Sequence, residues 1–306
     1  MQKQIRIATR SSALAMAQTN YVIGELKQEF EIIKVSNEVG DVNLQDPLYQ
    51  MPTVGVFTKQ VEQYLLEQKA DVAVHSLKDL PTIIDAQLYL AAYTKFEQRG
   101  DVVLLNNKYN YKSLSELPEG FKIGTSSLRR IATIKNRYPK LNLINIRGNL
   151  NTRIQKLDEG QYDAIILAKA GILRLGLSER ISFDLEEKEF LYAPAQAALG
   201  IQCRKDDLQT IARLQILNDI DSQKRCVAER MFLNLLEGGC RLPIAVYSEC
   251  REDGQVYIKG RVMAVDGSKV IEDEALDHFE KVGQILCEKI KVLGGVELIE
   301  SLKQQK

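Results

Sequence analysis

The 306-residue sequence has no tryptophan, only two histidines and five cysteines. Two histidines are too few to build the clustered ligand set of a zinc site, so we expect no metal centre. The cysteines show no CxxC spacing and their number is odd, which favours reduced thiols over a disulfide framework. No apolar run is long enough to cross a bilayer, and the N-terminus lacks the apolar core of a signal peptide. We therefore expect a cytoplasmic protein.

An excess of charge of either sign is also missing. The 41 Lys and Arg residues balance the 41 Asp and Glu residues, so the formal net charge is zero. No overall field attracts nucleic acid or a membrane surface, and we expect neither as a partner. Recognition by charge must then come from local clusters. The 45% hydrophobic content is ordinary for a globular protein, and the length requires two or three domains.

The first roughly 200 residues alternate strand and helix patterns, as α/β domains do. The pattern breaks at residues 98–100 and again at the alanine- and proline-rich stretch 192–200, which we interpret as crossings between two α/β units. The last third changes character. Strand patterns over 243–250, 255–265 and 269–275 are separated by Asp-Gly turn signals, and a helix pattern follows over 276–293. This predicts a small antiparallel α+β unit.

The segment Gly124 to Arg130 has the pattern of an anion site. A glycine ends a strand, the hydroxyl residues Thr125, Ser126 and Ser127 follow, and a helix begins with Arg129 and Arg130. Backbone N–H groups and the helix dipole favour a negative ligand there, and arginine forks suit carboxylates. By itself, the segment fits a capped surface helix with solvated arginines equally well.

Further arginines stand at strand ends or helix starts, where ligands bind in open α/β sheets. They are Arg10, Arg147, Arg153 and Arg174. A single arginine in such a place is usually structural or solvated. If they converged with Arg129 and Arg130, they would suit a ligand that carries several carboxylates.

Asp79 lies in HSLKDLP, directly after a predicted strand and before a proline. A carboxylate at the end of a strand can act as an acid or base, or can stabilise a developing cation. Lys78 would hold Asp79 ionised or bind substrate. The alternative is an ordinary turn aspartate. We interpret His75 as a packed or hydrogen-bonded residue and not as a base.

Cys240 lies in EGGCRLP, after a helix predicted over about 223–237. The glycines suit helix termination and leave room for another group, and Arg241 favours the reactive thiolate. The alternative is a small buried apolar residue in a turn.

Five motifs, in order, carry a family resemblance: HSLKDLP, GTSSLRR, IRGNLNTR, AIILAKAGILRLGL and EGGCRLP. Together they resemble porphobilinogen deaminases (hydroxymethylbilane synthases) over nearly the whole chain. The resemblance implies two α/β domains similar to periplasmic binding proteins, with a cleft between them, and a small three-stranded antiparallel α+β domain. The implied limits are 1–95 with 197–216, then 99–192, then 220–306. It also implies a monomer.

The resemblance implies a transferase of haem and tetrapyrrole biosynthesis. Such an enzyme condenses four porphobilinogen molecules head to tail with loss of ammonia, and water then releases a linear tetrapyrrole. Asp79 would be catalytic, and a covalently bound dipyrromethane cofactor would be linked to Cys240 by a thioether. The other implied cofactor-binding residues are Ser76, Lys78, Asp79, Thr125, Ser126, Ser127, Arg129, Arg130, Arg147 and Gly148. The implied substrate-binding residues are Arg10, Gln18, Arg153 and Arg174.

The sequence departs from the family pattern in three places. The loop over Gln50 to Val54 lacks the usual lysine, and the crossover Phe96 to Gly100 lacks one expected substrate-binding arginine. Ala195 and Ala197 replace glycines, which we expect to stiffen that crossing. There are two alternatives. The chain could be an anion-binding protein without turnover, or a family member that has lost catalysis.

Overall fold

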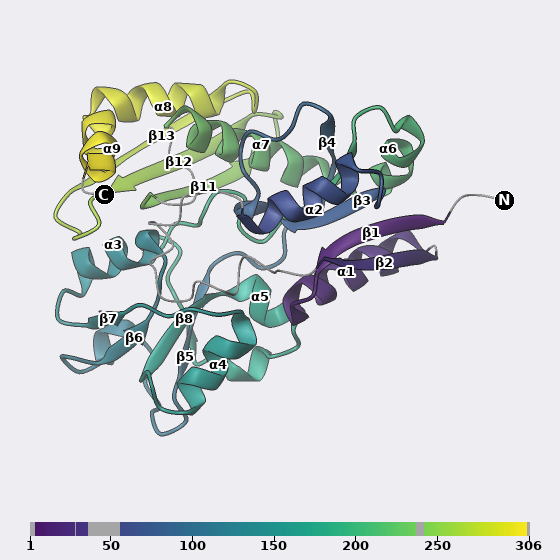
Figure 1. Ribbon diagram of the computed structural model, residues 1–306. Coiled ribbons are helices and arrows are strands. Elements are labelled where there is room, and N and C mark those ends of the chain that lie inside the picture. Colours follow the sequence, from purple (N-terminus) through teal and green to yellow (C-terminus); the bar gives the residue numbers. More distant parts are fainter. Residues whose placement is uncertain (1–3, 28, 36–55, 237–241, 305–306) are drawn as a thin grey trace.

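The computed structural model describes residues 4–27, 29–35, 56–236 and 242–304 (Figure 1). Within this part of the chain the strands form two five-stranded sheets and one three-stranded sheet. No helix in these residues combines the length and the apolar character needed to cross a membrane. The predictions for Cys240 and for the loop from Gln50 to Val54 fall outside the described residues.

The first sheet has the strand order β2-β1-β3-β10-β4, and β10 runs antiparallel to both of its neighbours. Its strands are β1 (Ile5–Arg10), β2 (Phe30–Val35), β3 (Val72–Ser76), β4 (Leu88–Tyr93) and β10 (Leu199–Arg204). Alternate residues point to opposite faces. Ile5 and Ile7 pack with helix α1 (Ala13–Leu26), whereas Ala8 packs with helix α2 (Val56–Leu66). Helix α6 (Leu208–Leu214) completes the unit.

The second sheet repeats this plan with the order β7-β6-β8-β5-β9. Its strands are β5 (Asp101–Leu105), β6 (Lys122–Gly124), β7 (Asn142–Ile144), β8 (Ala164–Ala168) and β9 (Phe183–Asp184). Its helices are α3 (Leu128–Arg137), α4 (Leu150–Asp158) and α5 (Lys169–Arg174). Here β5 is the antiparallel strand. In both sheets the antiparallel strand directly follows a crossover from the other unit, so the chain passes between the units at 94–100 and 193–198.

The third unit, green to yellow in Figure 1, is an antiparallel sheet with helices packed on one face. Its strands are β11 (Ile244–Cys250), β12 (Val256–Met263) and β13 (Val270–Asp277), and its helices are α7 (Ile220–Leu235), α8 (Val282–Val292) and α9 (Gly295–Gln304). Gly260 of β12 is needed for this packing, because a Cβ there would lie 2.6 Å from the Phe232 ring of α7.

These sheets confirm the predicted class of two α/β units and a small three-stranded α+β unit. The helix predicted over 276–293 starts too early, because Leu276 continues β13 and pairs with Tyr257 of β12. The helix begins only at Val282. Helix α7 starts at Ile220, earlier than predicted, because Asp219 caps it by accepting a hydrogen bond from the Ser222 N–H at 2.8 Å.

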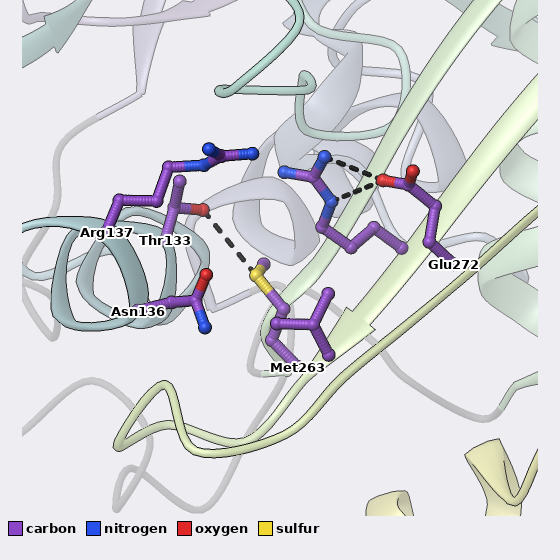
Figure 2. A pocket seen from close by; sticks show the side chains of 7 residues that line it. Thr133, Asn136, Arg137, Met263 and Glu272 are labelled. Carbon is purple, nitrogen blue, oxygen red and sulfur yellow. Dashed lines mark hydrogen bonds and ion pairs between the residues drawn. The ribbon is translucent and has the colours of Figure 1, made fainter.

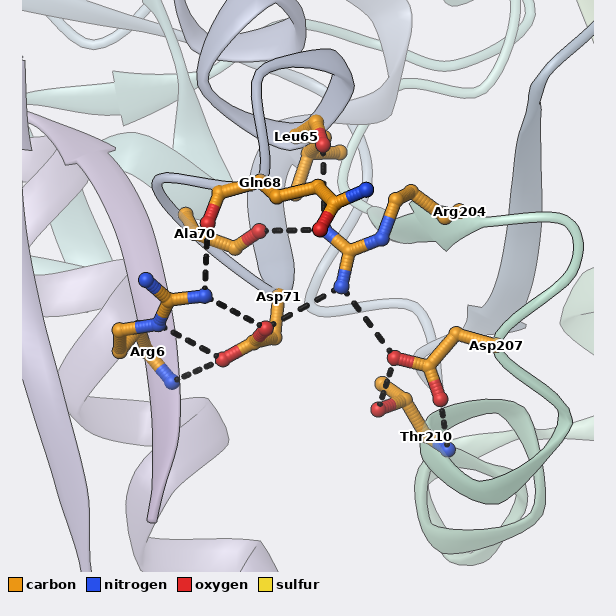
Figure 3. Close-up of polar contacts among 8 residues, drawn as sticks. All are labelled: Arg6, Leu65, Gln68, Ala70, Asp71, Arg204, Asp207 and Thr210. Atoms are coloured by element: carbon orange, nitrogen blue, oxygen red, sulfur yellow. Dashed lines mark hydrogen bonds and ion pairs between the residues drawn. The ribbon is translucent and has the colours of Figure 1, made fainter. Parts of the chain in front are cut away.

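A buried carboxylate fixes the N-terminal end of β3. Asp71 accepts hydrogen bonds from Arg6 of β1 and from Arg204 at the end of β10, at distances of 2.9–3.1 Å (Figure 3). Although burial opposes the shift, these guanidinium groups hold the pKa of Asp71 well below its usual range. The ion pairs therefore lock neighbouring strands at the end of β3 opposite to Asp79.

A second buried carboxylate joins the crossovers to the third unit. Glu229 of α7 has no exposed surface and accepts hydrogen bonds from both terminal nitrogens of Arg99, at 2.9 and 3.0 Å. It also accepts from the Ala195 N–H at 2.6 Å and from the Ser248 hydroxyl. The Arg99 guanidinium stacks on Phe96 and Tyr192 as well. The arginine that remains in the first crossover is thus bound to a structural partner.

Two alanines of the second crossover have backbone angles in the left-handed region. Ala195 has φ +59° and Ala197 has φ +83°, and both are buried. Left-handed backbone is disfavoured for alanine by about 1–2 kcal/mol. Neighbouring groups hold this conformation. Glu229 binds the Ala195 N–H, and the Ala197 carbonyl accepts from Arg174 at 2.6 Å and from the Glu97 N–H at 3.3 Å.

This strain predicts that Ala195→Gly and Ala197→Gly each raise the free energy of unfolding, by about 0.5–1 kcal/mol, because glycine adopts left-handed backbone without a Cβ clash. Urea denaturation of purified variants measures the change. Ala198→Gly is the control in the same segment. Its φ is not positive, so glycine there should lower the free energy of unfolding. Destabilisation at all three positions would contradict this account of the crossover.

Candidate active site

Asp79 stands at the C-terminal end of β3, as predicted. The strand ends at Ser76, and Leu77–Asp79 form a single 3-10 turn in which the Asp79 side chain is exposed and Lys78 is half-buried. Gln18 of α1 donates a hydrogen bond to the Ser76 hydroxyl at 2.7 Å. The Leu77 N–H donates to the Ala198 carbonyl at 3.1 Å, so the turn is attached to the second crossover.

The predicted anion segment forms the junction between β6 and α3. The Thr125 hydroxyl accepts from the Ser127 N–H at 3.3 Å, and Ser127 caps α3 by accepting from the Arg130 N–H. The Ser126 hydroxyl bonds to Asn145 and to the Ile146 backbone. These hydroxyls therefore shape the strand-to-helix turn. Whether they also bind the cofactor stays a prediction.

Arg129 and Arg130 are buried and share one carboxylate. Arg130 donates a hydrogen bond to Asp101 at 2.8 Å, and Arg129 forms an ion pair with the other oxygen of Asp101 at 2.8 Å. The other terminal nitrogens of Arg129 and Arg130 donate to the carbonyls of Leu191 and Ile166 at 2.8 Å. Although burial opposes the shift, the pair of guanidinium groups keeps the pKa of Asp101 well below its usual range. The Arg130 Nε–H is buried without an acceptor among the described residues.

Asp101 was not singled out in the sequence. The sequence around Asp101 gives little indication of a role, since Asp101 only follows the interruption of the strand and helix pattern at Gly100. Its partners lie 28 and 29 residues away in the chain (129 minus 101, and 130 minus 101). The same carboxylate also accepts a hydrogen bond from Gln196 of the second crossover at 3.1 Å. Asp101 therefore binds both the start of α3 and the crossover, a role that depends on the fold and not on local pattern.

The structure brings Lys78 and Asp79 of the first unit near cations of the second unit. Burial, helped by Arg130 and Arg147 and opposed by Asp79, lowers the pKa of Arg153 to about 10. Burial also lowers the pKa of Lys78, and Arg130 acts on it in the same direction. Arg153 is held by a 2.9 Å hydrogen bond from its Nε to the Gly148 carbonyl. Gly148 itself has φ +111°, which favours glycine.

Two further predicted arginines, Arg174 and Arg10, come from α5 and β1. Arg174 donates to the Ala197 carbonyl at 2.6 Å, and its electrostatic neighbours are Glu97 and Tyr21. Arg10 ends β1 and is half-buried. Arg174 thus contacts the crossover directly, and its role toward a substrate stays a prediction.

His75 is hydrogen-bonded, as the sequence indicated. Its Nε2 lies 3.0 Å from the Gln202 side-chain oxygen, and the Gln202 amide donates to Glu62 at 2.8 Å. All three side chains are buried. Burial lowers the pKa of His75 to about 4, so the ring is neutral at physiological pH. A carbonyl-type oxygen accepts only, so Nε2 carries the proton in this arrangement.

A pocket of ≈ 210 Å³ opens between α3 and the strands β12 and β13 (Figure 2). Its polar groups are already bound within the protein. Arg261 pairs with Glu272, Thr133 donates to the Arg129 carbonyl, and the Asn136 amide donates to the Gly267 carbonyl. None of the predicted site residues that the structure describes lines this pocket. The candidate active site is therefore the cluster around Asp79, Lys78 and Arg153.

Two family models match consecutive parts of the chain. The model described as "Porphobilinogen deaminase, dipyromethane cofactor binding domain" matches residues 5–212, and "Porphobilinogen deaminase, C-terminal domain" matches residues 223–292. Together they cover both α/β units and most of the third unit.

Curated relatives match over almost their whole length. A porphobilinogen deaminase of Prochlorococcus marinus (strain MIT 9312) is 41% identical over 309 residues, covering 99% of this chain and 98% of the relative. One of Gloeobacter violaceus is 42% identical over 311 residues, covering 99% and 94%.

Solved structures show weaker similarity. The periplasmic VFT2 domain of Bordetella pertussis BvgS has a TM-score of 0.40 at 13% identity, covering 74% of this chain and 91% of that domain. A putative methionine-binding lipoprotein of Bacillus subtilis has a TM-score of 0.42 at 15% identity, covering 71% and 91%.

The shared carboxylate predicts that Arg129→Leu lowers the free energy of unfolding by about 3 kcal/mol, because Asp101 would lose one partner of a buried ion pair. Arg137→Leu, in the same helix, is the matched control. Its side chain is 43% exposed and lies 3.7 Å from Glu189, so its loss should change stability by less than about 1 kcal/mol. Equal effects of the two substitutions in chemical denaturation would argue against a structural role for Arg129.

Proposed function

The chain belongs to the porphobilinogen deaminase family. We propose that Asp79 is its catalytic carboxylate and that Cys240 anchors its cofactor. The enzyme is a transferase of tetrapyrrole biosynthesis. It joins four porphobilinogen molecules head to tail on a dipyrromethane cofactor, releases ammonia at each addition and yields a linear tetrapyrrole.

The cationic cluster fits a dipyrromethane, which carries an acetate and a propionate on each ring. The pKa values of Lys78 and Arg153 are lowered by burial and by neighbouring cations, which indicates positive charge that an anion would stabilise. The buried Arg130 Nε–H, without an acceptor among the described residues, points the same way. When bound, the cofactor supplies an unsubstituted pyrrole carbon as nucleophile. Lys78, Arg130, Arg147 and Arg153 would hold its carboxylates.

The observation that carries the catalytic assignment is the position of Asp79. Its carboxylate is exposed at the end of β3 and acts electrostatically on Arg153 of the other α/β unit. Loss of ammonia from the aminomethyl group of porphobilinogen leaves positive charge shared between the methylene carbon and the pyrrole ring. A fixed carboxylate at the pyrrole N–H stabilises that charge as it develops. The backbone hydrogen bonds of this turn, from Leu77 to Ala198 and from Leu80 to Leu77, support this role for Asp79.

The arginines contribute orientation and not bond making. Substrate carboxylates bound by guanidinium forks keep the ring at a fixed angle to Asp79. The Gly148 carbonyl accepts a hydrogen bond from the Arg153 Nε–H, which restricts the orientation of that guanidinium. The arginines of the second unit would thus bind the substrate, and the Asp79 carboxylate of the first unit would act in catalysis.

Three of the four described cysteines are buried and unsuited to be the anchor, and burial also raises the pKa of the fourth, the partly exposed Cys250. Cys203, Cys226 and Cys287 are at most 1% exposed. Burial raises the pKa of Cys203 to about 12 and raises those of Cys226 and Cys287, so these thiols form the reactive thiolate poorly. Cys240 has Arg241 beside it, which favours the thiolate. We infer a reducing, cytoplasmic setting because the four described cysteines are free thiols. The monomeric state stays a prediction.

Asp79→Asn should leave fold and cofactor content intact and lower kcat by about 100-fold to 1,000-fold, because the amide has the same shape but cannot stabilise the developing cation. KM should change little. Steady-state kinetics gives both values, and intact-protein mass checks that the cofactor is present. Asp85→Asn, an exposed aspartate in the next loop, is the control and should turn over normally. Near-normal kcat in a cofactor-loaded Asp79→Asn enzyme would refute the assignment.

A further inference from the structure

We propose that Arg230 is a positioning residue that holds the catalytic turn from the third unit, an inference that rests on the role proposed for Asp79. Arg230 lies on α7 and is 9% exposed. Its terminal nitrogens donate to the carbonyls of Leu80 at 2.8 Å, Pro81 at 2.6 Å and Leu77 at 3.4 Å. These carbonyls flank Asp79 on both sides.

The turn needs such a donor. A single 3-10 turn satisfies little of its own backbone, and here the Leu80 N–H donates to the Leu77 carbonyl at 3.2 Å to close it. Buried carbonyls beyond this bond require a partner from elsewhere. A planar guanidinium presents several N–H groups in a rigid fork, so one side chain can bind neighbouring carbonyls and fix their relative positions.

Arg230 belongs to a stripe of α7 that packs along the turn. Cys226, Arg230 and Asn234 are spaced four residues apart and so lie on one helix face. Cys226 packs in an apolar cluster with Leu77 and Leu80. Asn234 accepts a hydrogen bond from the Thr82 hydroxyl at 2.9 Å. The segment 77–82 is therefore bound to α7 by apolar contact, by the guanidinium and by an amide.

The neighbouring residue on α7 binds the crossovers. Glu229 accepts from Arg99 of the first crossover and from Ala195 of the second. Consecutive side chains of one helix thus fix the crossovers and the catalytic turn together. Helix α7, which precedes the proposed anchor Cys240 in sequence, therefore also holds the turn that carries Asp79.

Loss of the Arg230 guanidinium should lower turnover more than it weakens substrate binding. Arg130 and Arg153, two of the cations proposed to bind carboxylates, lie in the second unit and hydrogen-bond there to the carbonyls of Ile166 and Gly148, away from the turn that Arg230 holds. Catalysis depends on the placement of the Asp79 carboxylate, and a displacement of about 1 Å can lower a rate about 100-fold. A structural role alone would lower stability without this separation of kcat from KM.

The test uses cofactor-loaded Arg230→Met enzyme. We expect kcat to fall about 10-fold to 100-fold, with KM within about twofold of wild type. Arg230→Lys keeps the charge but loses the fork, so its kcat loss should be smaller. Arg225→Met is the matched control on the same helix, since Arg225 contacts Phe96 and Ser248 and not the turn. It should keep normal kcat.

A double-variant cycle separates this inference from the role of Asp79. If Arg230 acts through Asp79, adding Arg230→Met to Asp79→Asn should lower kcat no further. Losses that multiply, or wild-type kcat in cofactor-loaded Arg230→Met, would overturn the inference while leaving Asp79 catalytic. Normal turnover of Asp79→Asn alone would instead remove the proposed function. If Arg230→Met does not fold, Arg230→Lys takes its place in the cycle, with the same expected and contradicting results.

Discussion

The arrangement of the three units depends on the ion pair and hydrogen bonds of the buried Glu229 carboxylate. A charge without exposed surface is tolerated only when it is paired and hydrogen-bonded. Arg99, the Ala195 N–H and the Ser248 hydroxyl meet that requirement, and they come from both crossovers and from the third sheet. Because the carboxylate needs all of these partners at once, it binds both crossovers to α7. The next residue of α7, Arg230, then reaches the turn that carries Asp79.

Although the chain has no net charge, its arginines fall into two groups with different surroundings. Some are paired inside the protein, as Arg129 is with Asp101 and as Arg99 is with Glu229. Arg153 has cationic neighbours that lower its pKa, and Lys78 is affected in the same way. The first group builds the scaffold, and the second gives a nearly neutral protein a local preference for polycarboxylates. The carboxylate of Asp79 lies at the edge of this second group.

Features that depend on neighbouring residues could be predicted from the sequence. Asp79 follows a strand, Ser127 caps α3, and the Asp-Gly turns separate the strands of the third unit, because strand alternation and capping are local. Interactions across the fold could not be predicted. The pairing of Asp101 with α3, the contact of Arg230 with the turn and the left-handed angles of Ala195 and Ala197 arise only when distant segments pack together. The start of α8 was misplaced because Leu276 suits a strand and a helix equally well, and only pairing with Tyr257 decides between them.

The central claim is that this scaffold works on a primer tethered to Cys240. The mass of the intact, freshly purified protein tests it most directly, compared with that of Cys240→Ala. The account predicts that the wild-type mass exceeds the sequence mass by one dipyrromethane and that the Cys240→Ala mass does not. An unmodified mass for active wild-type enzyme, or the added mass retained in Cys240→Ala, would contradict it.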